Sequence, residues 1–99
     1  MNIDLKDGNT DRLYKAILAL KTEEECRNFF EDLCTVFEIK AMAQRLAVAE
    51  LLLDKLVYSD IVEKTGASTA TISRVNRSLY YGKNGYKCVL ERIEEKDSE

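Results

Sequence analysis

The chain of 99 residues contains no histidine, proline or tryptophan. Without histidine, the sequence excludes Ser-His-Asp and Cys-His nucleophile systems and imidazole metal ligands. Its three cysteines are odd in number and form no CxxC pair, so they indicate free thiols rather than a disulfide scaffold or a zinc site. No apolar run approaches the roughly 20 residues of a membrane span, and the polar N-terminus lacks a signal-peptide pattern. We therefore expect a cytoplasmic protein without metal or membrane contact.

Acidic residues outnumber basic residues, which gives the chain a formal net charge of −3. Taken over the whole chain, this charge argues against nucleic acid as a partner. The distribution is uneven, however. Residues 55–87 contain six basic and two acidic groups, whereas the remaining residues contain nine basic and sixteen acidic groups. The sequence therefore predicts a basic segment on an acidic body, which is typical of phosphate binding.

The absence of proline and the long tracts of 3.6-residue periodicity predict an all-α chain of five to six helices in one domain, residues 1–99. After eleven frayed residues, we expect a first helix at about residues 10–20. Two capping boxes, Thr22 with Glu25 and Thr35 with Glu38, predict the starts of the next two helices. The third helix is expected to reach about Leu56, and an amphipathic helix is expected to begin near residue 86.

The predicted third helix is apolar around most of its circumference, since Leu46, Val48 and residues 51–53 do not form one stripe. A chain of this length has too little mass to bury such a helix on several sides. The apolar cluster before it poses the same difficulty; its members are Phe29, Phe30, Val36 and Phe37. We therefore expect a homodimer with an interleaved helical core, with a compact monomer as the alternative.

A helix-turn-helix is predicted within residues 58–80. Ile61 and Val62 mark the inward face of a short helix, and Gly66 follows where a left-handed backbone ends it. Ser68 is a natural N-cap for a second helix, whose inward residues are Ile72, Val75 and Leu79.

The outward side of that second helix carries short hydroxyl side chains at its start and arginines further along. In a DNA-binding helix-turn-helix, the start of the second helix enters the major groove. Small polar side chains suit base edges there, and arginines suit guanine or phosphate. The predicted DNA-binding residues are Ser68, Thr69, Ala70, Thr71, Ser73, Arg74, Arg77 and Lys83. Tyr80, Tyr81 and Tyr86 flank the following loop, and we expect them to cover the joint with the core rather than stack on sugar-phosphate.

The segment A-S-T-A-T-I-S-R-V-N-R-S-L resembles the recognition segment of the Trp repressor family, which reads roughly G-A-x-x-A-T-I-T-R-x-x-x-S-L. Upstream, Val48 and residues 50–52 match that family's V-E-E-L-L tract. The chain resembles the shorter Trp-repressor-related proteins of Gram-positive bacteria. The resemblance implies an all-helical, intertwined homodimer with two DNA-reading heads. Headpieces of the lactose-repressor kind share T-I-S-R-V-N, but they stand at the start of much longer chains.

The resemblance also implies an effector pocket, in which members of the family bind an indole amino acid. Here Gln44 corresponds to the arginine that packs on the indole, and Val75 corresponds to the glycine that leaves room for it. We therefore expect no cofactor and, in particular, no tryptophan corepressor. An effector of unknown chemistry is left open, with candidate pocket residues Gln44, Arg45, Arg74, Val75 and Ser78.

The sequence thus favours a sequence-specific DNA-binding transcriptional regulator that binds double-stranded DNA as a homodimer at a pseudo-palindromic operator. We expect a repressor, and an activator stays open. We expect it in the bacterial cytoplasm, on the nucleoid when DNA-bound. Two alternatives stay open: a helical protein–protein interaction module, and a small all-α dimeric enzyme using Arg45, Arg74 and glutamates around an anionic substrate. No nucleophile with a base is recognisable, so an enzyme is not expected.

Overall fold

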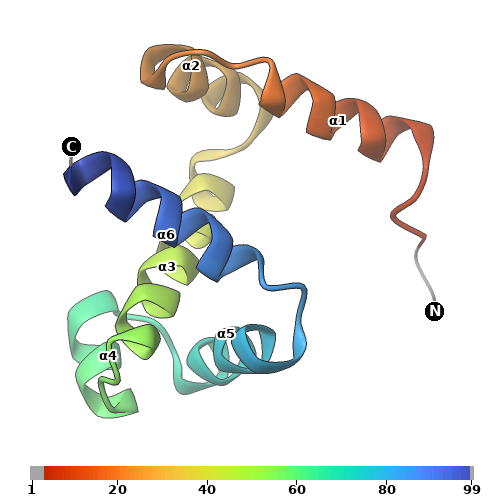
Figure 1. Ribbon diagram of the computed structural model, residues 1–99. Coiled ribbons are helices and arrows are strands. Elements are labelled where there is room, and N and C mark those ends of the chain that lie inside the picture. Colours follow the sequence, from red (N-terminus) through yellow and green to blue (C-terminus); the bar gives the residue numbers. More distant parts are fainter. Residues whose placement is uncertain (1–3, 99) are drawn as a thin grey trace. The chain divides into compact units, whose positions relative to one another are not determined.

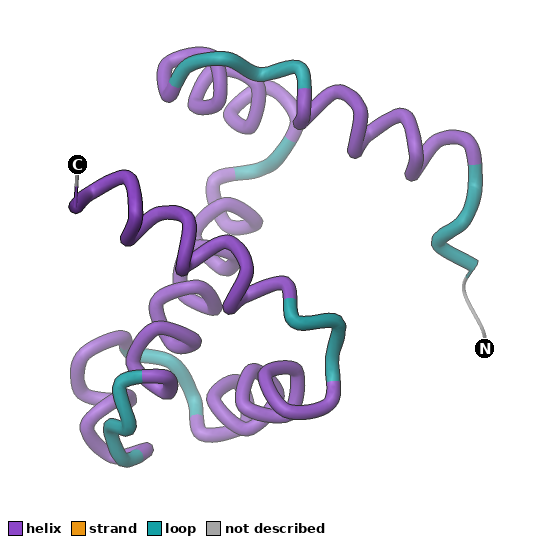
Figure 2. Tube along the Cα trace, viewed as in Figure 1, coloured by secondary structure: helices purple, strands orange, loops and turns teal. Residues whose placement is uncertain are grey.

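The structure is a computed structural model that describes residues 4–98, except the side chain of Ser98. Six helices span these residues, and no strand occurs among them (Figures 1 and 2). The helices are α1 (Gly8–Leu18), α2 (Glu23–Leu33), α3 (Val36–Leu53), α4 (Tyr58–Thr65), α5 (Thr69–Tyr81) and α6 (Gly85–Ser98). This confirms the predicted all-α class with five to six helices. Within the described part of the chain, no helix is long and apolar enough to cross a membrane.

The chain divides into two compact units, Met1–Ile39 and Lys40–Glu99. The first unit contains α1, α2 and the first turn of α3, and the second contains the rest of α3 with α4, α5 and α6. Because α3 belongs to both units, the expectation of one domain over residues 1–99 stays a prediction.

The helix α1 begins earlier than its periodicity predicts, so the expectation of eleven frayed residues is wrong for Gly8 onward; residues 1–3 lie outside the described residues. The cause is Asp7, an N-cap. Its carboxylate accepts from the backbone N–H of Thr10 at 2.7 Å and from the Thr10 hydroxyl at 2.9 Å. These hydrogen bonds lower the pKa of Asp7 from its ordinary value of 3.8.

Both predicted capping residues begin helices. Thr22 Oγ1 accepts from the N–H of Glu25 at 3.0 Å, but Glu25 Oε1 accepts from the N–H of Lys21 rather than closing the box on Thr22. The second box is complete. Thr35 Oγ1 accepts from the N–H of Glu38 at 3.1 Å, and Glu38 Oε1 accepts from the N–H of Thr35 at 2.8 Å. That return bond holds the pKa of Glu38 below its ordinary value of 4.5.

The helix α3 ends at Leu53, three residues before the predicted end, because Lys55 adopts a left-handed backbone with φ 68°. The N–H of Leu56 donates to the carbonyl of Leu51 at 3.1 Å, and the N–H of Lys55 donates to the carbonyl of Leu52 at 3.0 Å. This pair of bonds is a Schellman motif, which usually has glycine at the left-handed position. Lysine occupies it here, so the sequence carries no stop signal.

The buried core belongs to the second unit. Its fully or nearly fully buried members come from α3, α4, the turn after α4, α5 and α6; they are Val48, Ala49, Ile61, Ala67, Ile72, Val75 and Leu90. Half-buried leucines of α3 and Tyr86 of α6 pack against them. The elements that carry the predicted helix-turn-helix are therefore held by one continuous apolar cluster.

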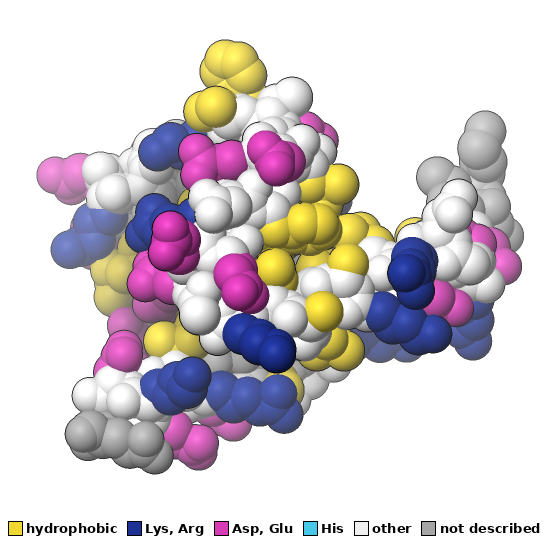
Figure 3. All heavy atoms as spheres, turned by 90° about the horizontal axis from the view of Figure 1, so that it is seen from above, with side chains coloured by type: hydrophobic (Ala, Val, Ile, Leu, Met, Phe, Trp, Pro, Cys, Tyr) yellow, Lys and Arg dark blue, Asp and Glu magenta, His cyan; other side chains and the backbone are white. Residues whose placement is uncertain are grey.

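The first unit has no buried side chain among residues 4–39. Instead, several large apolar side chains are exposed, including Leu18 at 84% and Phe37 at 86%. Hydrophobic side chains are also openly visible beside charged ones on the face drawn in Figure 3. Exposed apolar area of this extent is unusual for a protein that works as a single copy.

Candidate nucleic-acid interface

The helices α4 and α5 are joined by a tight turn that begins at Gly66, as the sequence predicts. Gly66 caps α4 with φ 73°, in the left-handed region that side chains disfavour, and its N–H donates to the carbonyl of Val62 at 2.8 Å. Ala67 is buried in the core, so the turn is anchored rather than loose. Ile61 in α4 and Ile72 in α5 are both fully buried, which fixes the two helices against a common apolar cluster.

Thr65 and Gln44 hold this turn through side-chain hydrogen bonds that the sequence did not predict. The Thr65 hydroxyl donates to the carbonyl of Ile61 at 2.7 Å and accepts from the N–H of Ala67 at 3.1 Å. Gln44 Nε2 in α3 then donates to the carbonyl of Thr65 at 3.2 Å. Gln44 therefore ties the end of α4 to α3. The sequence predicts Gln44 only as an effector contact, because spacing along the chain does not reveal a hydrogen bond between residues 21 positions apart.

The start of α5 is held by Ser68 in the role predicted for it. Its Oγ accepts from the N–H of Thr71 at 3.1 Å, and its hydroxyl lies within hydrogen-bond distance of Thr71 Oγ1, also at 3.1 Å. Thr71 is half-buried, whereas Ser68 remains exposed. Two of the candidate DNA-binding hydroxyls thus also stabilise the first turn of the helix.

The other candidate DNA-binding residues of α5 are exposed; they are Thr69, Ala70, Ser73, Arg74 and Arg77. Lys83 is also exposed and lies in the connection to α6. The opposite side of α5 is occupied by Ile72, Val75 and the half-buried Leu79. The structure therefore brings the start of α5 and its arginines onto one solvent-facing side.

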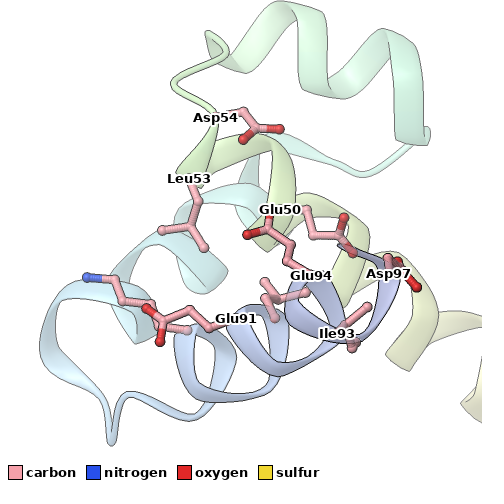
Figure 4. A pocket seen from close by; sticks show the side chains of 9 residues that line it. Glu50, Leu53, Asp54, Glu91, Ile93, Glu94 and Asp97 are labelled. Carbon is pink, nitrogen blue, oxygen red and sulfur yellow. The ribbon is translucent and has the colours of Figure 1, made fainter. Parts of the chain in front are cut away.

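The charge of this region is of one sign. Residues 64–90 contain five basic groups and no acidic group. Acidic groups gather instead around a cavity of about 460 Å³ between α3 and α6. Its acidic lining residues are Glu50 of α3, Asp54 directly after α3, and Glu91, Glu94 and Asp97 of α6 (Figure 4); Lys87 of α6 is the one basic residue in the lining. The cationic surface can attract a polyanion, whereas the acidic cavity repels one.

A second cavity, of about 700 Å³, lies between α3, the end of α5 and the start of α6. Among the candidate effector residues, Arg45 and Ser78 line it, together with apolar side chains such as Met42, Leu46 and Val89. The other three candidates lie elsewhere. Gln44 is bonded to Thr65, Arg74 is exposed on α5, and Val75 is 1% exposed within the core.

The three tyrosines near the end of α5 differ in their surroundings. Tyr86 is half-buried and packs against the core, as expected. The same expectation is wrong for Tyr80 and Tyr81, which are 65% and 86% exposed. Because α5 places Leu79 inward, the two residues that follow it are turned toward solvent.

Among the described residues, no group of three or more histidine, cysteine, aspartate or glutamate side chains is placed to hold a metal ion. The three cysteines, Cys26, Cys34 and Cys88, are free and half-buried. The exposed side of α5 itself offers hydroxyl and guanidinium groups, which suit hydrogen bonding and cationic contact.

Comparison with known proteins identifies relatives over nearly the whole chain. The profile of the Trp repressor protein family matches residues 8–94. The uncharacterized protein YerC from Bacillus subtilis (strain 168) is 50% identical over 100 residues, which cover 100% of this chain and 96% of YerC. The crystal structure of a TrpR-like protein from Eubacterium eligens ATCC 27750 matches with a TM-score of 0.88 at 54% identity, over 91% of this chain and 93% of that one. A candidate Trp repressor from Staphylococcus aureus gives a TM-score of 0.87 at 48% identity, over 91% and 90%.

Proposed function

Because the chain belongs to the Trp repressor family, we propose that it is a sequence-specific DNA-binding transcriptional regulator that acts as a homodimer. The family consists of regulators rather than enzymes. The observation that carries the proposal is the exposed side of α5. It follows an anchored turn, begins with short polar side chains, continues with arginines, and lies in a segment without acidic groups. This is the surface that a helix-turn-helix inserts into the major groove.

In this role, the exposed start of α5 reads base edges through Thr69, Ala70 and Ser73, with Thr71 beside them. Arg74, Arg77 and Lys83 contact guanine or phosphate oxygens and set the register of the protein on the duplex. Ser68 contributes by holding the first turn of α5 and by its exposed position beside the DNA. The regulator acts in the cytoplasm as a repressor, by occupying its operator on the nucleoid.

The homodimer is supported by the first unit, whose apolar side chains are half-buried or exposed, with none fully buried among residues 4–39. A second copy of the chain provides apolar surface of the same kind, and a two-fold interface makes each exposed patch meet its counterpart. The two copies of α5 then enter successive major grooves on one side of the duplex, about 34 Å apart.

Tryptophan is not the corepressor under this proposal. Val75 stands where the family has a glycine that leaves room for the indole, and its side chain fills the core. Gln44 stands where the family has an arginine, and its amide is engaged with Thr65. An effector, if the protein uses one, has the cavity lined by Arg45 and Ser78 available. Calorimetry should detect no micromolar binding of tryptophan, and such binding would refute this part of the proposal.

The decisive experiment is selection of bound sites from genomic fragments, followed by footprinting at base resolution. We expect a pseudo-palindromic site with half-site centres about 34 Å apart. Arg77→Ala should weaken binding and reduce the slope of log affinity against log salt by about one, because one phosphate contact is lost. Arg92→Ala removes the same charge from α6, outside residues 64–90, and should leave the slope unchanged.

Absence of DNA binding at moderate salt would overturn the proposal and favour a protein-interaction module. An unchanged salt slope for Arg77→Ala would contradict its phosphate contact. A site without two-fold symmetry would contradict the dimeric mode of binding.

A further inference from the structure

The exposed side of α5 continues beyond its arginines to Tyr81, the last residue of the helix. Arg74, Arg77 and Tyr81 are spaced three and four residues apart, so they lie on one stripe of the helix. All three are exposed, and within residues 4–98 none of their side chains has a hydrogen-bond or ion-pair partner. The phenol of Tyr81, at the end of this stripe, is therefore accessible for contact with another molecule.

The position of Tyr81 is set by the way α5 ends. The N–H of Gly82 donates to the carbonyl of Ser78 at 3.0 Å, and a Cβ at Gly82 would collide with that same carbonyl oxygen. The chain therefore turns tightly against the end of the helix. Since Tyr81 directly precedes this turn, its backbone is held in the last turn of α5 rather than in a loose loop.

The charge around Tyr81 favours a polyanion as its binding partner. The segment from residue 64 to residue 90 is free of acidic groups, and Arg77 lies one turn before Tyr81 on the same stripe. Between Arg74 and Tyr81 the helix rises about 10 Å, so the arginines and the phenol can contact different phosphates. Tyrosine hydroxyls are among the donors that proteins use toward phosphate oxygens.

We propose that Tyr81 contacts the sugar-phosphate backbone beside the half-site, its hydroxyl donating to a phosphate oxygen and its ring packing on the adjoining deoxyribose. This inference rests on the proposed DNA-binding function and extends the contact surface to the C-terminal end of α5. A phenol is uncharged, so its contact adds affinity without releasing a counterion. A backbone contact also carries no sequence preference of its own. Tyr81 therefore acts differently from both the arginines and the base-reading residues.

The test compares Tyr81→Phe with the wild-type protein on a selected operator and on a mismatched duplex, over a series of salt concentrations. Removal of the hydroxyl should weaken binding about tenfold on both duplexes, as expected for a hydrogen bond to a charged acceptor. The salt slope should stay that of the wild type. Tyr80→Phe is the matched control, because Tyr80 lies about 100° around the helix from Tyr81. The Tyr80→Phe variant should bind both duplexes with wild-type affinity.

A second arm identifies the acceptor. Neutral methylphosphonate linkages are placed one at a time in the backbone that flanks a half-site. At one position the substitution should weaken wild-type binding and remove most of the difference between the wild type and Tyr81→Phe. Circular dichroism and the thermal midpoint should be the same for all variants, since both tyrosines are exposed.

Several outcomes would overturn the inference: wild-type affinity for Tyr81→Phe, an equal loss for Tyr80→Phe, a changed salt slope, or no methylphosphonate position that removes the difference. These outcomes leave the proposed function standing as long as the wild-type protein binds its operator. Failure of the wild-type protein to bind any DNA would instead overturn the proposed function.

Discussion

The two units of this chain are both helical, but their helices are held in different ways. In the first unit, each helix start has a side-chain cap, provided by Asp7, Thr22 and Thr35. In the second unit, α4 begins after Val57 without any side-chain cap, yet its Ile61 is fully buried. Caps decide where a helix begins, whereas burial decides whether it is stable in its surroundings.

The two units therefore differ in whether they can bury enough apolar surface by themselves to be stable. Helices of 11 residues, the length of both α1 and α2, are marginal on their own in water, and caps do not change that. The first unit therefore needs apolar cover from outside residues 4–39. The second unit has a core of its own, which holds α5 in position. In the proposed homodimer, the partner copy provides this apolar cover for the first unit.

The largest expected effect is on Phe37, which is 86% exposed in one copy of the chain. In the proposed homodimer it is buried at the interface, so Phe37→Glu should raise the dimer dissociation constant at least about a hundredfold. Sedimentation equilibrium measures this constant. Phe37→Leu keeps an apolar side chain and should have a much smaller effect. If Phe37→Glu dimerised as tightly as the wild type, Phe37 would not be buried at the dimer interface, and other contacts would have to cover the apolar side chains of the first unit.

A smaller effect is expected in the second unit at Ile72, which is fully buried. Ile72→Ala should reduce the free energy of unfolding by about 2–5 kcal/mol, because it removes buried methyl groups and leaves a cavity. Ile72→Val should cost about 0.5–1.5 kcal/mol. Chemical denaturation measures both values. A loss for Ile72→Ala no greater than that of Ile72→Val would show that the core of the second unit is not tightly packed around this residue.

The smallest effect concerns pH and the caps of the first unit. Glu38 has its pKa lowered, chiefly by the hydrogen bond from the Thr35 N–H, so its carboxylate stabilises the folded state above its ordinary pKa of 4.5. This stabilisation should be lost as the pH falls below 4.5 through the lowered value. Glu38→Gln retains an acceptor but does not titrate there, so unfolding should depend less on pH in this range.

Carboxyl NMR titration measures the pKa of Glu38 directly. A pKa for Glu38 at or above its ordinary value would mean that the capping box at the start of α3 does not persist in solution.

Much of the candidate site was predictable because its signals are local. A glycine at the end of α4 and a serine three residues before Thr71 act through their own backbone neighbours, so Gly66 and Ser68 take the predicted roles. The end of α3 was missed because Lys55 takes the left-handed position without a glycine. The role of Gln44 was missed because its partner, Thr65, is distant in sequence.

The sequence by itself determined the helical class, the starts of α2, α3 and α5, and the outward side of α5. These follow from periodicity and from hydrogen bonds within a few residues. Only the tertiary structure decided that the core lies wholly in the second unit, that Val75 fills it, and that Tyr81 stands free in solvent beside the arginines. The physical reason is that burial depends on which elements meet, and helical spacing alone does not specify the neighbour that a side chain will have.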